Sequence, residues 1–203
     1  MTTTLPLSRD RILRCAVELA DRDGLEATSL RKVAGELGVH VTSLYHHVAT
    51  KDALLDGIVE ELFATAPLPH GSDPWDLWVR RFIDAIGQIA RTHPGAFAVL
   101  LRRAVQGPRA AATFEAGLAA FQRAGMDVPA AYTAVKSVAL ASIGACMEQT
   151  VTGDNGPSTD MSQLPLEDFP VLHQASQTVD GIVDVAGALA DLLVAGFTAQ
   201  LAG

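Results

Sequence analysis

The chain has 203 residues and a formal net charge of −8, and 49% of its residues are hydrophobic but only 5% are aromatic. This length suffices for one large domain or two small ones with a substantial core. The opening "MTTTLPLSRDR" lacks the apolar segment of a signal peptide, and no apolar run looks long enough to span a bilayer. We therefore expect a cytoplasmic protein with no membrane partner.

Charge and cysteine content narrow the expected partners. Residues 1–51 hold seven Lys/Arg against six Asp/Glu, whereas residues 52–203 hold eight against seventeen. An acidic body would repel phosphate, so any nucleic-acid binding should be restricted to the N-terminal part. Cys15 and Cys146 both fall inside helix-like patterns, and we interpret them as small buried residues of a reduced protein, not as a disulfide or a metal site.

Short helices are predicted in the first third of the chain. Ser8, Thr28 and Thr50 are residue types that favour the position before a helix. Gly24 and Gly38 are suited to the left-handed turn that follows one. Between these signals, apolar residues recur at three- and four-residue spacing. Four helices result, and the third, from about residue 40 to residue 48, is the shortest.

The remainder of the sequence predicts further helices. The segment "TAPLPHGSDP" holds three prolines and ends the fourth helix, and Asp73 followed by Pro74 is a favourable start for the next one. Later helices are predicted over about 94–103, 109–124, 128–151, 170–177 and 180–201, with a polar loop at about 152–169. We find no strand alternation and no internal repeat. The predicted fold class is all-α.

The second and third helices have the dimensions of a helix-turn-helix, whose second helix enters the DNA major groove. The segment "TSLRKVAGELGVHVTSLYHHVATKDALLDGIVEEL" resembles the N-terminal domain of the TetR family of transcriptional repressors. About fifty residues carry this resemblance, through the glycine turns, the apolar face of the second helix, the Leu44–His47 run and Lys51. We expect a helix-turn-helix domain at residues 1–50 and a helical effector-binding and dimerisation domain at 51–203.

The residues of this motif suit DNA contact. Thr42 and Ser43 could reach base edges, and the hydroxyl of Tyr45 could donate to a phosphate. Arg31 and Lys51 could place positive charge on either side of the third helix. The predicted DNA-binding residues are Arg31, Val41, Thr42, Ser43, Tyr45, His46 and Lys51.

Two features depart from the family pattern. His40 stands where the family often has a Ser or Thr cap, and the basic extension before the first helix is thin. Plainer readings also exist for the polar cluster, in which Tyr45 fills the core and Lys51 is an ordinary solvated residue. A metal site at His40, His46 and His47 is disfavoured, because adjacent histidines on a helix diverge by about a hundred degrees.

The family resemblance implies an effector pocket in the body. Helical periodicity directs the following candidates inward: Phe63, Trp78, Phe82, Phe97, Leu101, Phe114, Phe121, Ile143 and Met147, with Glu148 as a polar candidate. Ordinary core packing would explain the same pattern. Polar residues within these stripes need partners that an effector could supply; they include His93, Arg102, Arg103, Gln106, Ser137, Ser142 and Gln149. We expect an apolar or amphipathic small molecule and no cofactor.

The last helix, "DGIVDVAGALADLLVAGFTAQL", is small or apolar almost all round, and Ala134–Met147 has the same character. Such helices must be covered on nearly every side. Packing against a second copy would give a four-helix interface, so we expect a homodimer; a central core helix within one chain is the alternative.

The sequence therefore predicts a dimeric, ligand-responsive repressor that binds a palindromic operator, with the fourth helix as the lever between domains. Two alternatives remain open. One is a helix-turn-helix activator or a partner-binding scaffold. The other is an enzyme that uses His93 or Glu148 as an acid–base group, but no nucleophile–base spacing or phosphate loop accompanies them.

Overall fold

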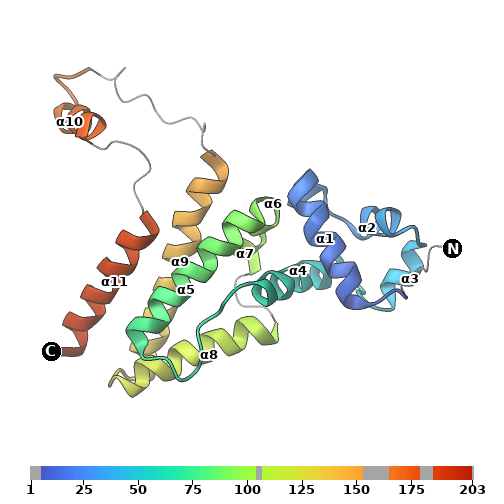
Figure 1. The fold of residues 1–203 in the computed structure, drawn as a ribbon, viewed down its shortest axis with the longest axis horizontal. Coiled ribbons are helices and arrows are strands. Elements are labelled where there is room, and N and C mark those ends of the chain that lie inside the picture. The colour runs from blue at the N-terminus through green and yellow to red at the C-terminus, as the bar shows by residue number, and fades with distance from the viewer. Residues whose placement is uncertain (1–5, 104–106, 153–164, 179–184, 203) are drawn as a thin grey trace.

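The computed structural model describes residues 6–103, 107–152, 165–178 and 185–202, without the side chains of 148–152 and 176–178. Every regular element in this part of the chain is a helix, which confirms the predicted all-α class. The molecule is elongated, with helices α1–α3 at one end and the body at the other (Figure 1). The segments at 104–106, 153–164 and 179–184, including Gln106 and most of the predicted polar loop, lie outside the described residues.

The first helix begins and ends as predicted. Helix α1 (Arg9–Asp23) is capped by Ser8, whose Oγ accepts from the backbone N–H of Arg11 at 3.3 Å. It ends at Gly24, which has a φ of +86° that favours glycine. A single 3-10 turn (Leu25–Ala27) then leads to α2.

The start of α2 (Leu30–Leu37) corrects one expectation. Ser29, not Thr28, is the N-cap, and its Oγ accepts from the N–H of Lys32 at 3.3 Å. The hydroxyl of Thr28 instead donates to the carbonyl of Gly24 at 3.1 Å, so it stabilises the preceding turn. Gly38 ends the helix in the left-handed conformation, as its position predicted.

Helices α3 and α4 complete the N-terminal half. Helix α3 (Val41–Tyr45) is shorter than the predicted 40–48 segment, which finishes as a turn. Helix α4 (Lys51–Thr65) is capped by Thr50, as predicted. It packs against α1 on one side and against α7 and α8 on the other, so it belongs to the cores of both the head and the body.

Helix α5 (Trp75–Thr92) begins one residue later than predicted. Pro74 occupies the N-cap position, and the carboxylate of Asp73 does not cap the helix. It accepts instead from the N–H of His70 at 2.8 Å and pairs with Arg81 at 2.7 Å. Arg123 also donates to the carbonyls of Gly71 and Asp73, so this carboxylate and one guanidinium of α8 hold the proline-rich connection in place.

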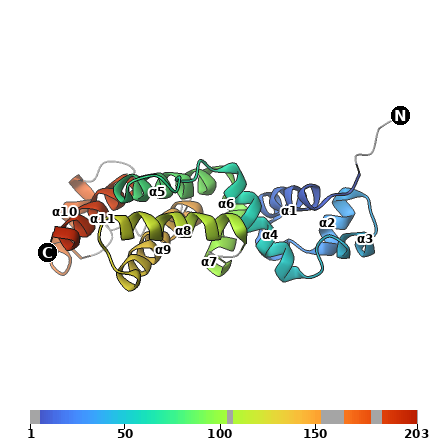
Figure 2. The same ribbon diagram turned by 90° about the horizontal axis from the view of Figure 1, so that it is seen from below.

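The remaining helices follow the prediction with small changes. The single helix expected at 94–103 is two, α6 (Pro94–Phe97) and α7 (Val99–Arg103), which meet at Ala98. They are followed by α8 (Pro108–Arg123), α9 (Val128–Thr152), α10 (Pro170–Thr178) and α11 (Val185–Ala202). Helices α5, α8 and α9 form the main core of the body, and α11 lies along α5 and α9 (Figures 1 and 2).

Helix α11 is poorly covered within one chain. Among its residues only Ala190 is buried, and the side chain of Leu192 is 72% exposed. By length and composition alone, Val128–Met147 and Val185–Ala202 are long and apolar enough to cross a membrane. The expectation that no apolar run could span a bilayer was therefore wrong. Within the body, however, α9 packs against α5, α8 and α11, as a core helix does.

Candidate DNA interface and effector site

Helix α3 is held by buried side chains on one face. Leu44 and Val48 are fully buried against the head, so the opposite face must point outward. Of the predicted DNA-binding residues, Thr42, His46, Arg31 and Lys51 are exposed, Tyr45 is 48% exposed, and Val41 and Ser43 are half-buried. The core-filler reading of Tyr45 is thereby excluded, and the whole predicted set remains accessible to a ligand.

The electrostatics of this face fit a polyanion. The described residues show no carboxylate paired with Arg31 or Lys51, whereas Asp23 and Glu36 pair with Arg22 between α1 and α2. The hydrogen bond and charge of Arg22 lower the pKa of Asp23. Arg31 and Lys51 are thus available to an anion, while two acids of α1 and α2 are paired with Arg22.

The helix termini around α3 differ in their caps. His40 is the N-cap of α3 and makes no side-chain capping bond, in keeping with its departure from the family pattern. The first turns of α2 and α4, each capped by a hydroxyl, present aligned backbone N–H groups that suit phosphate. Within the described residues, no three His, Cys, Asp or Glu side chains are grouped so as to hold a metal ion.

The head is joined to the body through α6. The carboxylate of Asp21 in α1 accepts from the Nδ1 of His93 at 2.8 Å and from the backbone N–H of Ala96 at 2.9 Å. Because a carboxylate can only accept, Nδ1 of His93 carries the proton. Gly95 permits this approach: a Cβ there would lie 2.3 Å from the carbonyl oxygen of Ala20.

A second set of contacts joins α4 to the body. Arg103 of α7 pairs with Asp56 at 2.7 Å and also with Asp52, and the hydrogen bond that Arg103 donates to Asp56 raises the pKa of the guanidinium. The carboxylate of Glu60 accepts from the N–H of Arg109 at 3.0 Å, at the first turn of α8. A movement of α4 would therefore displace α7 and α8, to which it is bonded directly.

Most predicted effector residues are inside the body. Trp78, Phe82 and Phe121 lie together: the Trp78 and Phe82 rings stack with centroids 5.0 Å apart, and Phe121 meets Trp78 edge-on at 6.4 Å. The other buried members are Phe63, Phe97, Phe114 and Ile143, and Met147 is partly buried.

Two predicted effector residues do not fit this picture. The side chain of Leu101 is 58% exposed, so the expectation that it points inward was wrong. It lies in the short helix α7, where only Val99 and Leu100 are buried. Glu148 lies in α9, but its side chain is outside the described part, as is that of Gln149.

Four of the polar residues within the apolar stripes, His93, Arg102, Arg103 and Ser142, already have partners in the protein. His93 binds Asp21 of α1, Arg103 binds Asp56 of α4, and Arg102 pairs with Glu26. The hydroxyl of Ser142 donates to the carbonyl of Val138 at 2.7 Å, and Ser137 is exposed. The paired side chains therefore connect the N-terminal helices to the body or bond within their own helix, and none of them requires an effector as its partner.

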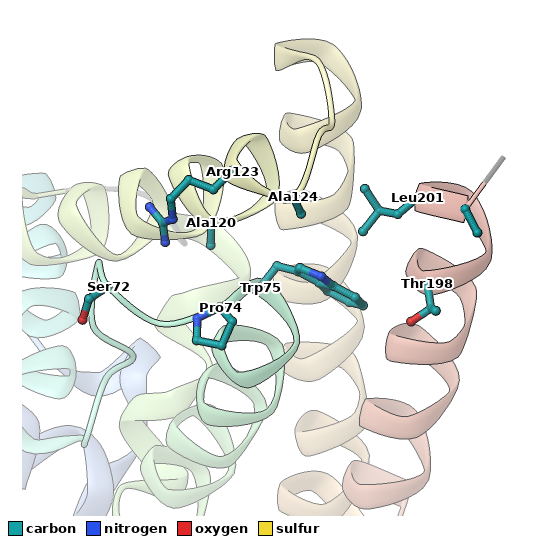
Figure 3. A pocket seen from close by; sticks show the side chains of 9 residues that line it. Ser72, Pro74, Trp75, Ala120, Arg123, Ala124, Thr198 and Leu201 are labelled. Atoms are coloured by element: carbon teal, nitrogen blue, oxygen red, sulfur yellow. The ribbon is translucent and has the colours of Figure 1, made fainter.

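A groove of about 640 Å³ lies at the end of the body farthest from the head. Trp75 lies between α8 and α11 here, with Arg123 on one side and Thr198 and Leu201 on the other (Figure 3). The Trp75 ring meets Phe121 at 5.6 Å and Phe197 at 6.3 Å. The sequence did not indicate this groove, because its walls come from three distant segments; none of the predicted effector residues lines it.

Comparisons with known proteins agree with this architecture. The family model described as bacterial regulatory proteins of the tetR family matches residues 12–58, which covers α2, α3 and most of α1 and α4. A curated HTH-type transcriptional regulator of Saccharopolyspora erythraea is 40% identical over 143 residues, and the match covers 68% of this chain and 61% of that protein. The chain thus spans about three fifths of that relative's length.

Two further matches extend over nearly the whole chain. The class D tetracycline repressor protein of Escherichia coli is 28% identical over 204 residues, covering 96% of this chain and 91% of that protein. The crystal structure of the Streptomyces coelicolor protein ActR in complex with actinorhodin has the same fold, with a TM-score of 0.81 at 22% identity over 98% of this chain and all of that one. An N-terminal helix-turn-helix head on a helical body is the architecture of a regulatory protein. The chain belongs to the TetR family.

Proposed function

We propose that the protein is a transcriptional repressor that binds a palindromic operator as a homodimer and is released by a small-molecule effector. The observation that carries this proposal is the geometry of α3. Leu44 of α3 and Val48 just after it are buried, and Thr42, Tyr45 and the following His46 are presented to solvent. Family membership and a near full-length match to a protein named as a repressor support the same function.

The dimer is supported by apolar surface on the body. Leu140 of α9 is 60% exposed and Leu192 of α11 is 72% exposed, and the two helices pack side by side. Large exposed side chains on adjacent helices mark an interaction surface. A second copy would cover them and would present two heads, which suits a two-fold symmetric operator.

Release by an effector follows from the way the domains are connected. An effector shifts DNA binding only if it prefers the conformation that cannot bind the operator. Helix α4 is bound to the head through α1 and to the body through Arg103 and the Glu60 carboxylate, so a change in the body interior alters the position of the head. A coupling free energy of about 1–3 kcal/mol would be typical of such a regulator.

The test is DNA binding by the full chain across a salt series. The probe is duplex DNA from immediately upstream of the chain's own gene, with a scrambled duplex of the same composition as the control. We expect specific binding whose logarithmic affinity falls with salt at about −0.9 per phosphate contacted. Equal affinity for the two duplexes at every salt concentration would contradict the proposal.

A further inference from the structure

One buried polar atom has no partner within the described residues: Nε1 of Trp78. The side chain is 0% exposed, so water outside the fold does not reach it. The neighbouring buried polar groups are satisfied, since Thr113 donates to the carbonyl of Arg109 at 2.9 Å and Ser142 donates within α9. Buried donors are almost always paired, because an unpaired one loses its bond to water without replacement.

The position of this N–H is defined by its ring neighbours. Cε2, the ring carbon bonded to Nε1, lies against α8 at Gly117, where an added Cβ would be only 2.7 Å away. Phe82 stacks on the indole and Phe121 meets it edge-on. The donor therefore lies on the edge of the indole that faces α8, in the interior between α5 and α8.

The surroundings limit what such a donor could bind. The buried side chains of α5 and α8 are apolar or aromatic apart from Thr113, and no ionisable side chain of these two helices is buried in the described structure. A charged ligand would lose its hydration here without gaining a counter-charge. An uncharged ligand with one acceptor would satisfy the indole and bury its remaining surface against aromatic rings.

We propose that the effector is a neutral, largely aromatic molecule with a carbonyl-type oxygen, and that this oxygen accepts a hydrogen bond from Nε1 of Trp78. Trp78 is then a specificity-determining residue, because it favours acceptor-bearing ligands over hydrocarbons of the same shape. This assignment rests on the proposed effector-binding function of the body. It adds a chemical class and a named donor to that function.

The chain permits a one-atom test. Trp75 and Trp78 are the only two tryptophans, so in a Trp75→Phe variant, biosynthetic replacement of tryptophan by 3-(3-benzothienyl)alanine changes position 78 alone. The analogue keeps the bicyclic shape and replaces the N–H with sulfur. The probes are 1-tetralone and tetralin, which share a frame and differ by one carbonyl. Their affinities are measured by calorimetry or by ligand-detected NMR.

We expect removal of the N–H to lower the tetralone-to-tetralin affinity ratio at least fivefold, since a buried carbonyl oxygen that loses its donor is costly. The Trp75→Phe chain with natural tryptophan should keep the wild-type ratio. An unchanged ratio, or a wild-type chain that does not bind tetralone, would overturn the assignment.

A second measurement does not depend on the substituted chain. In ¹⁵N-labelled wild-type protein, the indole resonance of Trp78, assigned by its retention in Trp75→Phe, should shift with tetralone and stay in place with tetralin. A resonance that tetralone leaves unmoved would refute the hydrogen bond. Binding to the upstream duplex is measured on the same samples: a chain that binds no DNA refutes the repressor, whereas the probe ratio reports on Trp78 alone.

Discussion

Asp21 of α1 holds the side chain of His93 at 2.8 Å and the backbone N–H of Ala96 at 2.9 Å, with its two carboxylate oxygens divided between them. One side chain of the DNA-binding head thus binds the start of α6 in the body. Both partners are only part-buried, at 24% and 20% side-chain exposure, so the contact is strong enough to orient the helices and close enough to solvent to be broken. The joint is a natural place for coupling between the two ends of the molecule.

Asp21→Ala should lower the free energy of unfolding by about 1–3 kcal/mol, because it leaves the His93 ring and the N–H of Ala96 unpaired. Asp21→Asn retains one carbonyl oxygen and should lose less. Urea unfolding followed by circular dichroism gives both values. Equal stability of Asp21→Ala and the wild type would show that the joint contributes nothing.

Gly95→Ala should destabilise the protein by about 1–3 kcal/mol or more, because the new methyl group would meet backbone atoms that cannot rotate away. Its Cβ would lie 2.3 Å from the oxygen of Ala20 and 2.6 Å from the Cα of Asp21. Gly35→Ala is the matched control, since a Cβ there meets nothing within 4 Å and alanine favours helix. We expect opposite signs in thermal unfolding, and equal effects would contradict the close approach of α1 and α6.

Asp73 predicts a pH dependence of stability. Burial would raise its pKa, but the N–H of His70 and the guanidinium of Arg81 outweigh burial, and the net pKa is lowered. A lowered carboxylate pKa contributes stability above the usual value of about 3.9, and this contribution is lost as pH falls through the lowered value. Asp73→Asn should therefore have a lower Tm than the wild type at pH 7.

The difference in Tm between the wild type and Asp73→Asn should shrink as pH falls below about 4. Glu115→Gln is the control, because Glu115 is exposed and pairs with no cation in the described structure. Thermal unfolding at pH 7, 5 and 3 gives the comparison. A gap between wild type and Asp73→Asn that stays constant over this range would rule out the charged pair as its cause.

Substitutions on the outer face of the head should separate two kinds of DNA contact. Lys51→Ala should weaken binding to all duplexes about equally and reduce the salt slope by about 1, as the loss of one phosphate contact does. Thr42→Ala should instead reduce the difference in affinity between operator and scrambled DNA, because base contacts carry sequence preference. Fluorescence anisotropy at several salt concentrations measures both. A selective effect of Lys51→Ala would reverse these assignments.

Leu192→Glu should shift the protein from dimer to monomer. The side chain is 72% exposed in one chain, so the charge costs the monomer little but would be buried without a counter-charge in the proposed interface. Sedimentation velocity at micromolar concentration reads the change. Leu166→Glu, at a similarly exposed leucine before α10, is the control and should remain dimeric.

The sequence predicted helices well because their signals are local. Ser8, Thr50, Gly24 and Gly38 all act at helix ends as expected. One error in the placement of a helix end arose where two neighbouring residues compete for one role. Thr28 and Ser29 are both good caps, and only the fold decides that the first bonds back to Gly24.

The candidate sites were predictable to different degrees. The proposed DNA-contacting residues all fall within one motif, residues 31–51, so the sequence alone could nominate them. Helical periodicity indicated that Trp78, Phe82 and Phe121 are buried, but it could not show that Leu101 points outward from a five-residue helix, nor that Trp78 lacks a hydrogen-bond partner among the described residues. Such properties depend on contacts between helices far apart in the chain.

The double attachment of α4 has a consequence for building hybrid regulators. Its acidic side chains Asp52, Asp56 and Glu60 bind partners beyond residue 100, and the same helix packs against α1, so a simple cut at residue 50 would separate α4 from the head that it supports. A transplanted DNA-binding domain that ends before α4 would have to pack its α1 against the α4 of another protein. Chimeras should therefore exchange residues 6–65 together with Arg103 in α7, so that the ion pairs between α4 and the body are kept.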